Sequence, residues 1–492
     1  MLSKIVHIFQ PDRLLQNKLV RIGLVYSLCI LYVLVLGYFI TKDKFIMAAI
    51  PVGLLVLMIA LYRLELIFWI ILFSVPFSIP LKELSTGLDF NMFLPTEPLL
   101  AGLLVIFIIK LATDGSFDRK VLRHPVTLII LFQLTWILVT SLTSTMPWVS
   151  LKFFLSRFWF VAVFYFMATQ VFRDPAKIRR YFWVILIPLA FMVIIITLKH
   201  ITLGLFDQQA SNPAADPFFN DHTLYGAIMT FFIPVAFGFL VKSNFNWWQR
   251  FGAFLVLGLL FTGLVFSYSR AAWISLAGAA MIYLIILFKV PWKTLLLGFA
   301  GLVAAFMFFG KTVLIDMEGN NQDSSDNFTE HIQSISNIST DASNLERLNR
   351  WSCAIRMFAK KPLLGFGPGT YMFQYAPFQK KSQKTIISTN AGDGGNAHSE
   401  YLGPLSEYGI FGGLSMLMLV IYSIITGMKV YKKQSDKELK MIAIVVLFSL
   451  ITYFLHGILN NFLDTDKASV GVWGFLAILV ALDVRSSSVK SE

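Results

Sequence analysis

The chain has 492 residues, of which 57% are hydrophobic and only 14% are charged, and its mean hydropathy is +0.70. Soluble domains contain about 45–50% apolar and about 25% charged residues, so this composition excludes an ordinary soluble protein and predicts an integral membrane protein. The formal net charge is +13. Because the cations lie mainly in short loops between apolar segments, they indicate membrane topology and contact with anionic lipid rather than nucleic-acid binding.

Apolar segments long enough to cross a bilayer recur along most of the chain. A membrane span needs about 20 apolar residues, within a range of about 17–25. We therefore expect an all-α polytopic membrane protein with about 14 transmembrane helices, the plausible range being 12–14. The predicted spans are residues 22–40, 45–62, 64–80, 96–112, 125–144, 151–172, 180–198, 222–241, 250–267, 270–288, 293–309, 403–428, 439–457 and 469–484.

Lys and Arg residues are distributed unevenly between the two alternating sets of loops. The set that includes both termini carries 24 of the 41 cations, and the opposite short loops with their adjoining helix ends carry eight. Since cytoplasmic loops carry the excess of Lys and Arg, we expect both termini to be cytoplasmic. The alternation then places the one long polar loop on the external face.

This long polar loop interrupts the apolar pattern once and suggests three regions. Residues 1–309 form an N-terminal bundle of about 11 spans, residues 310–402 form the large loop, and residues 403–492 hold about three spans and a cytoplasmic tail. Within the loop, residues 344–361 have the spacing of an amphipathic helix, which Pro362 ends. The apolar positions expected on one face of this helix are Leu345, Leu348, Trp351, Ile355 and Phe358.

Arginine is the first candidate for site chemistry, because its planar fork binds phosphate through two hydrogen bonds and stays charged at any physiological pH. Arg347 and Arg350 lie on the predicted loop helix. The alternative is that they reach toward anionic lipid headgroups beside the apolar face of that helix.

Two further arginines lie within apolar segments. Arg270 is located where two spans meet at the external face, and a helical hairpin tip is its simpler explanation. Arg157 lies about two turns inside its span, where a charge is costly and is a functional candidate by default. The structural alternative for Arg157 is an internal ion pair with a carboxylate such as Glu97 or Glu407.

Histidine is the second candidate. His398 lies in a polar cluster just before a span, and a neutral imidazole accepts a proton as attack by a hydroxyl group requires. The alternative is a structural histidine at a helix N-terminus. Glu400 and Glu407 are possible supporting residues, and His222 at the start of another span is a weaker second candidate. No HExxH, CxxC cluster or paired His spacing suggests a metal, and we expect no cofactor.

A run of glycines between residues 365 and 369 has the composition of a phosphate-binding loop but not its context. No strand precedes it and no Lys-Ser or Lys-Thr pair follows it. We therefore expect a turn that joins the loop helix to the next segment.

The order of these motifs resembles that of the O-antigen ligase and O-antigen polymerase superfamily. The motifs are Ser269-Arg270-Ala271-Ala272-Trp273, then Arg350-Trp351 followed by Pro362–Gly367, then Asn396–Tyr401 and Glu407–Gly413. The resemblance is strongest from about Phe219 to Leu417. It implies a multi-pass protein of the bacterial inner membrane whose large loop is periplasmic.

The resemblance also implies a reaction. A glycan attached through pyrophosphate to undecaprenol would be moved to an acceptor hydroxyl, which lies on lipid A-core for a ligase and on a second lipid-linked glycan for a polymerase. It further implies that Arg270 and Arg350 hold the pyrophosphate, with Arg157 as a further candidate, and that His398 is the base. An O-antigen ligase-like glycosyltransferase is the expectation, and a polymerase of the same superfamily is the alternative.

A polysaccharide transporter or flippase is the alternative from another class. Transporters commonly place acidic residues or broken helices near the bilayer midplane. Here the centres of the predicted spans carry almost no Asp or Glu, and the ionisable residues gather at one face. This distribution favours chemistry on a membrane-anchored substrate over passage through the bilayer.

Overall fold

The computed structural model describes residues 18–41, 62–84, 92–114, 117–242, 245–291, 342–381 and 395–488, with a few isolated positions between these ranges. The described residues are mainly helical, and the strands β1 and β2 pair antiparallel through Ile79 with Leu94 and Pro80 with Phe93. In chain order the elements are α3 (Lys18–Ile40), α5 (Leu64–Ser74), η2 (Val75–Phe77), β1 (Ile79–Pro80), η3 (Leu81–Leu84), β2 (Phe93–Leu94), α6 (Thr96–Asp114), α7 (Arg119–Leu122), α8 (Pro125–Leu142), α9 (Pro147–Val161), η4 (Ala162–Met167), α10 (Ala168–Val171), α11 (Pro175–Leu203), α12 (Ser211–Ala215), α13 (His222–Val241), α14 (Trp247–Phe266), α15 (Arg270–Leu287), α18 (Ala342–Lys360), α19 (Tyr371–Gln374), η5 (Ala376–Phe378), α20 (Leu402–Lys433), α21 (Lys437–His456) and α22 (Asp466–Ser488).

Among the described residues, 11 helices are long and apolar enough to cross a membrane, and each coincides with one of the predicted spans. The predicted span at 64–80 is instead a shorter apolar helix, Leu64–Phe77. The predicted spans at 45–62 and 293–309 lie almost entirely outside the described residues. The prediction of an all-α polytopic membrane protein is therefore confirmed, whereas the count of 14 spans is not.

The chain forms two compact units. The smaller consists of residues 1–64 and 81–92, and the larger of residues 65–80 and 93–492. The smaller unit contains the apolar helix α3, whereas the larger unit contains ten of the candidate spans and every candidate site residue. The predicted division at residues 309 and 402 follows membrane topology rather than packing, and it stays a prediction.

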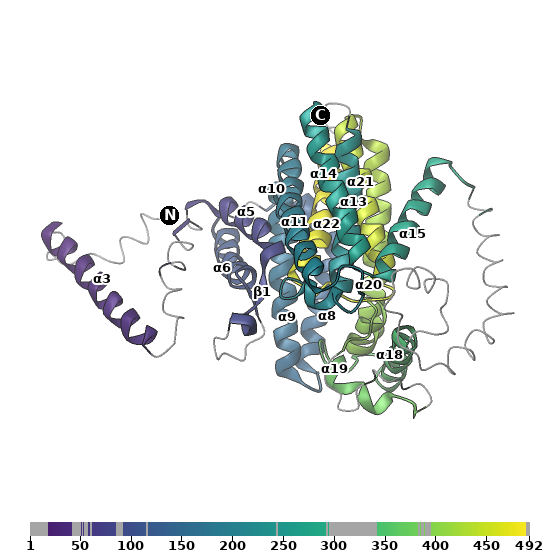
Figure 1. Cartoon of the computed structure of the whole chain (residues 1–492), viewed down its shortest axis with the longest axis horizontal. Coiled ribbons are helices and arrows are strands. Elements are labelled where there is room, and N and C mark those ends of the chain that lie inside the picture. The colour runs from purple at the N-terminus through teal and green to yellow at the C-terminus, as the bar shows by residue number, and fades with distance from the viewer. Residues whose placement is uncertain are drawn as a thin grey trace. The chain divides into compact units, whose positions relative to one another are not determined.

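The helix α22 lies at the centre of the larger unit (Figure 1). Of its spanning window 94% is buried, compared with 78% for α13 and α21 and 22% for α15. Trp473, near the middle of α22, is fully buried. A helix that is apolar around its whole circumference needs neighbours on every side, and α20, α21 and η4 supply them.

Acidic and basic side chains tie the helix ends together at the C-terminal end of α22. Asp483 pairs with Lys429 and with His124, and Glu438 pairs with Lys242 at 2.8 Å. These residues come from loops that the sequence places on one side of the membrane. The structure therefore gathers the Lys-rich loops at one end of the bundle, and the assignment of that end to the cytoplasm stays a prediction.

The opposite end carries the predicted loop helix, which is observed as α18 (Figure 1). Its buried face differs from the predicted apolar stripe: Ile355 is 53% exposed, whereas Glu346, Asn349 and Arg350 are buried. The reason is that these polar side chains find partners inside the loop. Arg350 pairs with Glu346 at 2.7 Å, and the Asn349 amide donates to Gln379 at 3.2 Å. Buried polar groups are tolerated when they are paired in this way.

A break at Gly409 bends α20 near its N-terminal end. Gly409 has φ 73°, a left-handed conformation that favours glycine. The turn after α18 satisfies the backbone groups near the break: the Ile410 amide donates to the Pro362 carbonyl at 2.8 Å, and the Gly367 amide donates to the Glu407 carbonyl at 2.8 Å. The glycine-rich segment is thus a turn that packs on α20, in line with the sequence analysis.

We expect Gly409→Ala to lower the stability of the protein by about 1–3 kcal/mol or more, because a side chain at this φ is strained. A Cβ atom there would also lie 2.1 Å from the Leu363 carbonyl oxygen. The measurement is the midpoint of thermal unfolding in detergent micelles. Gly258→Ala is the matched control, since nothing lies within 4 Å of a Cβ in this helical position. An unchanged midpoint for Gly409→Ala would contradict the role of the break.

Candidate functional site

Four titratable side chains at the α18 end of the larger unit lie within the electrostatic influence of Arg347 of α18. The Arg347 charge acts on Arg270 at the start of α15, on His222 at the start of α13, on His398 just before α20 and on His456 at the end of α21. These residues are far apart in the sequence but come from helix ends at one side of the bundle. The fold therefore places Arg270, His222 and His398 within the electrostatic influence of Arg347, and the functional roles predicted for these residues stay predictions.

Arg347 and Arg270 place two positive charges in this group. Burial lowers the pKa of the Arg347 guanidinium, whereas the neighbouring Asp221 carboxylate raises it, and the net shift is downward. Arginine does not lose its proton in proteins, so the lowered pKa indicates the energetic cost of burying this charge. An anion bound beside both groups would relieve this cost.

The N-terminus of α15 adds to the attraction for an anion. Arg270 is the first residue of this helix, and the Ser269 side chain caps it by accepting from the Ala272 amide at 3.4 Å. The N-terminal amides of a helix carry partial positive charge and bind anions such as phosphate. The guanidinium of Arg270 therefore lies where the helix itself also favours a negative ligand.

His398 is held in an unusual backbone conformation. Its φ is 47°, which is uncommon for a residue other than glycine. Two hydrogen bonds stabilise this geometry: its amide donates to Asn396 Oδ1 at 3.0 Å, and Trp351 Nε1 donates to its carbonyl at 3.1 Å. Strained residues of this kind persist where the surrounding structure determines them, often at functional sites.

Arg350 lies beneath the His398 segment. It pairs with Glu346, donates through Nη1 to the Asn396 carbonyl at 3.3 Å, and stacks over Tyr375 at 4.9 Å. A Cβ atom at Gly395 (φ 102°) would lie 1.7 Å from this guanidinium, so only glycine fits there. These contacts favour a positioning role for Arg350, and the predicted pyrophosphate contact of this residue stays a prediction.

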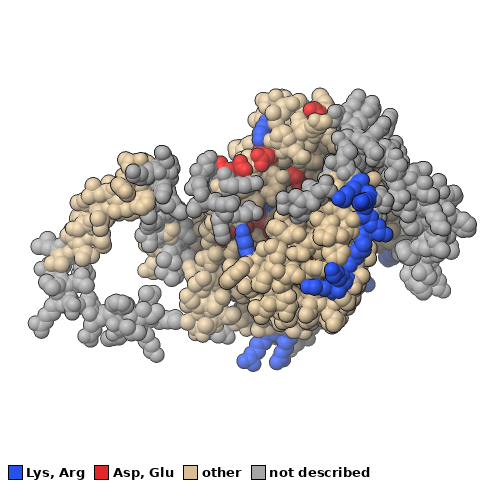
Figure 2. All heavy atoms as spheres, turned by 90° about the horizontal axis from the view of Figure 1, so that it is seen from below, with Lys and Arg blue, Asp and Glu red and all other residues tan. Residues whose placement is uncertain are grey.

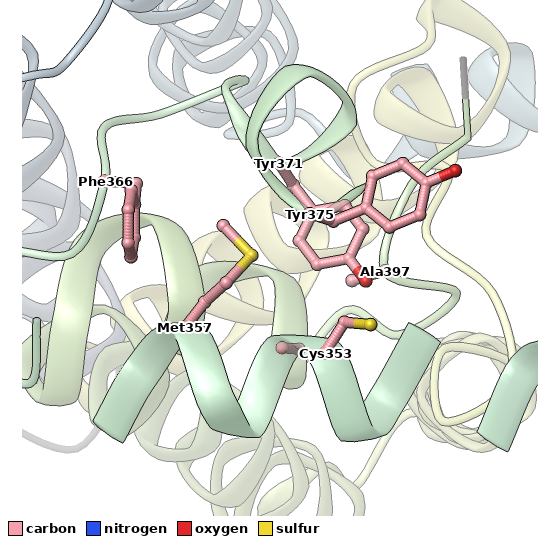
Figure 3. Packing of buried hydrophobic residues seen from close by; sticks show 7 residues of the cluster. Cys353, Met357, Phe366, Tyr371, Tyr375 and Ala397 are labelled. Carbon is pink, nitrogen blue, oxygen red and sulfur yellow. The ribbon is translucent and has the colours of Figure 1, made fainter. Parts of the chain in front are cut away.

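A small hydrophobic core supports the same segment from below (Figure 3). Ala397, the neighbour of His398, packs with buried Cys353 and Met357 of α18 and with Tyr371. Tyr371 and Tyr375 are stacked with ring centroids 5.4 Å apart. This core fixes the spacing between α18 and the His398 segment.

The environment of His398 decides its protonation state. Burial and the charges of Arg347 and Arg350 lower the pKa of His398 to about 4, although a hydrogen bond with the Asn460 side chain and the Asp221 charge oppose the shift. The imidazole is therefore neutral at pH 7 and has a lone pair that can accept a proton. Negative charge bound near the arginines would raise its pKa and make it a stronger base.

Glu400 and Glu407, predicted as supporting residues, bind backbone groups. Burial raises the pKa of Glu400. Its Oε1 accepts from Tyr453 Oη at 2.6 Å and from the amides of Phe462 and Leu463 at 2.7 and 2.8 Å. Glu407 Oε1 accepts from the Tyr371 amide at 2.9 Å. Glu400 thus fixes the α21–α22 connection, and Glu407 fixes the turn after α18.

Arg157 is buried and forms an ion pair with Asp464, and it also lies over the rings of Phe153 and Trp473 at 5.5 and 5.8 Å. An internal ion pair was the structural alternative for Arg157, but its partner is Asp464 rather than Glu97 or Glu407. The phosphate-binding role of Arg157 stays a prediction.

His222, the second histidine candidate, belongs to the same group. Its Nδ1 donates to the Ser267 carbonyl at 2.6 Å, which joins α13 to the loop before α15. Its backbone amide donates to Asn212 Oδ1 at 3.0 Å. The neighbouring Asp221 caps α13 by accepting from the Leu224 amide at 2.7 Å. These contacts hold His222 against the loop that leads to Arg270.

Sequence reasoning missed three members of this group: Asp221, His456 and Asn460. Asp221 precedes His222 directly, and the N-cap position of a span was its only signal. His456 and Asn460 are buried, and Asn460 Nδ2 lies 3.2 Å from His456 Nε2. Their His-x-x-x-Asn spacing lies after the motifs that carry the family resemblance, so the sequence offered no link between them and His398.

The surface next to the site is basic. Figure 2, which views the molecule from the end where α18 lies in Figure 1, shows a row of Lys and Arg side chains on this face. The exposed lysines Lys360, Lys380, Lys381 and Lys384 belong to α18 and the segment after η5. Within the part of the chain that the structure describes, no group of three or more His, Cys, Asp or Glu side chains is arranged to hold a metal ion.

The fold and the site define a multi-pass membrane protein with a cationic, histidine-containing site at one end of its helix bundle. Residues 253–417 match the family model described as O-antigen ligase. This segment contains Arg270, Arg347, Arg350 and His398, and the match confirms the resemblance to the O-antigen ligase superfamily. It supports an enzyme of the ligase or polymerase type that acts on lipid-linked glycans. No curated protein has significant similarity to the chain.

We expect His398 to titrate near pH 4 in the ligand-free protein, and Arg347→Gln to raise its pKa toward the ordinary value of about 6.5. The sign follows because removal of a nearby positive charge favours the protonated imidazole. The measurement is a ¹³C-histidine NMR titration in nanodiscs, with the His398 signal assigned by its absence in His398→Gln. Arg250→Gln, at the opposite end of the bundle, is the control. An Arg347→Gln pKa no higher than that of the parent would contradict the electrostatic contact.

Proposed function

We propose that this protein is an O-antigen ligase-like glycosyltransferase that moves a glycan from undecaprenyl pyrophosphate to an acceptor hydroxyl at the periplasmic face of the bacterial inner membrane. The observation that carries the proposal is the convergence of Arg270 and Arg347 with the neutral imidazole of His398. Two fixed cations suit a diphosphate, and a neutral imidazole suits an acceptor hydroxyl. The family match over residues 253–417 supports the same class of reaction.

In the proposed reaction, His398 accepts the proton of the acceptor hydroxyl, whose oxygen attacks the anomeric carbon of the donor glycan. The new carbon–oxygen bond forms as the bond from that carbon to the phosphate oxygen breaks. Attack from the face opposite the leaving group inverts the configuration at the anomeric carbon. Undecaprenyl pyrophosphate leaves with the electron pair, and Arg270 and Arg347 stabilise the developing negative charge.

The electrostatics of the site support an order of events. Before the donor binds, the arginine charges keep His398 a weak base, with a pKa of about 4. A bound diphosphate offsets these charges and raises the pKa of His398. The base therefore becomes effective only when the donor is in place. In this order the imidazole of His398 stays neutral at neutral pH before the donor binds, and donor binding is linked to activation of the acceptor.

Arg270 and Arg347 form the primary diphosphate site in this proposal. Arg350 holds the His398 segment, and Arg157 with Asp464 stabilises the neighbouring helix ends. The proposal thus gives Arg347 the diphosphate contact that the sequence analysis expected of Arg350. It rests on the pairing of Arg350 with Glu346 and on the charge of Arg347 acting on Arg270, His222 and His398.

A transporter or flippase is less well supported. The ionic groups of this site lie at the ends of α13, α15 and α21 rather than along a path between helix centres. The central helix α22 is packed on nearly all sides, with 94% of its spanning window buried. Such packing favours a rigid frame that holds a surface site over two bundles that rock around a central substrate.

We expect His398→Ala to lower the turnover number by about 10²–10⁴-fold, the usual contribution of a general base. Arg347→Gln and Arg270→Gln should lower kcat/KM for the lipid-diphosphate donor by about 10²-fold or more, as for loss of a group that stabilises transition-state charge. The assay follows glycan transfer by the purified protein in nanodiscs. Arg356→Gln, on the same helix α18, is the matched control. Full turnover by correctly folded His398→Ala would contradict the proposed base.

Deletion of the gene in its bacterial host distinguishes the two acceptors. For the ligase-like reaction we expect bare lipid A-core on gels of surface glycans, together with accumulation of lipid-linked polymer. Single repeat units on core would instead identify the polymerase alternative. Unchanged surface glycans with the donor retained at the cytoplasmic face would favour a flippase.

A further inference from the structure

A second buried histidine lies next to the proposed site and has no part in the reaction described above. His456 ends α21, is 1% exposed, and contacts the backbone of Ala271, the residue after Arg270. Four residues later, Asn460 is 3% exposed. Both residues lie outside the segment that matches the family model. Their burial beside charged groups raises the question of what they hold in place.

Asn460 connects the two histidines. Its Nδ2 lies 3.2 Å from His456 Nε2, and its side chain also forms a hydrogen bond with His398. A carboxamide has one donor end and one acceptor end. When Nδ2 donates to the lone pair of His456 Nε2, Oδ1 is left to accept from a ring N–H of His398. That bond fixes the proton on one ring nitrogen of His398 and leaves the lone pair of the other nitrogen free.

The backbone around Asn460 is rigid enough for this task. The backbone amide of Asn460 donates to the His456 carbonyl at 3.2 Å, and the backbone amide of Glu400 donates to the Gly457 carbonyl at 2.7 Å. The Glu400 carboxylate accepts from the amides of Phe462 and Leu463. Since Glu400 follows His398 by two residues, the same short segment presents the histidine and clamps the connection that carries Asn460.

We propose that Asn460, oriented by His456, is a positioning residue that holds the ring of His398 in the tautomer and orientation required of the base. This inference rests on the proposed function, because it assigns an orienting partner to the proposed base. A base must point its lone pair at the proton that it accepts, and a third group commonly fixes that direction. The contact with His456 orients the side-chain carboxamide of Asn460, and this carboxamide orients the ring of His398.

The charged groups around His398 bear on any measurement of its pH dependence. Arg347 and Arg350 of α18 disfavour its protonated form, and Asp221 before α13 favours it. A carboxylate in place of the Asn460 amide would add a second negative charge and favour protonation of His398.

The first test compares Asn460→Ala with its neighbour Asn461→Ala in the glycan-transfer assay in nanodiscs. We expect Asn460→Ala to lower kcat by roughly 10-fold or more with KM for the donor nearly unchanged, because orientation of the base accounts for part of its about 10²–10⁴-fold effect. Asn461→Ala should retain turnover within about twofold. In the His398→Ala background, Asn460→Ala should have no further effect, since the two residues act as a unit.

The second test uses Asn460→Asp, which preserves the shape of the side chain and the acceptor oxygen. We expect the acid limb of its kcat profile to move to higher pH by at least half a unit, because a carboxylate in contact with His398 favours the protonated imidazole, whereas a side chain at position 460 without contact to His398 would leave the limb in place. Turnover and pH profile of both Asn460 variants equal to those of the parent would overturn the inference. If Asn460→Ala fails to fold, the pH profile of Asn460→Asp decides.

The two proposals fail separately in these experiments. Full turnover by His398→Ala would refute the proposed base and, with it, the role of Asn460. Inactive His398→Ala combined with parental behaviour of both Asn460 variants would refute only the positioning role.

Discussion

The burial of the Arg347 charge at one end of a membrane bundle is the constraint on which the site depends. Its charge acts on Arg270, His222, His398 and His456, and these residues begin or end separate segments of the chain. Burial of like charges is unfavourable, so packing elsewhere must hold the arrangement. The result is a cationic site that favours an anionic ligand. In the proposed reaction, binding of a diphosphate and proton acceptance by the imidazole are two aspects of one electrostatic arrangement.

Packing elsewhere takes two forms. The central helix α22 and its neighbours make a frame in which helix ends are fixed, and catalytic groups on rigid elements keep their geometry better than groups on free loops. The segments at the α18 end of the bundle are then hydrogen-bonded to this frame at a few points. Gly409 lets the turn after α18 bind α20, Arg350 holds the His398 segment, and Glu400 holds the connection after α21.

A site at the end of the bundle also suits a substrate that is anchored in the membrane. A lipid-linked donor diffuses in the plane of the bilayer, and its diphosphate lies at the level of the headgroups. The helices α13 and α15 begin at His222 and Arg270, at the end of the bundle where α18 lies. The exposed lysines beside α18 extend the positive potential over the adjoining surface and would favour approach of anionic headgroups.

Hydropathy and residue type by themselves determined the fold class and most of the span positions, and they singled out Arg270, Arg350, Arg157 and His398 as site candidates, with Arg347 as a possible supporting residue. These inferences depend on local composition: a bilayer demands continuous apolar segments, so a charge or a polar cluster between them is conspicuous. Only the tertiary structure decided which of the conspicuous residues meet. Arg350 and Arg347 are three positions apart on one helix, yet one pairs with Glu346 and the other faces the histidines, because the buried face of α18 is defined by its partners rather than by its apolar stripe. Arg157 found its carboxylate in Asp464, more than three hundred residues away, and Asn460 came to lie between two histidines for the same reason. Long-range contacts of this kind follow from how helices pack, and no local pattern of residues encodes them.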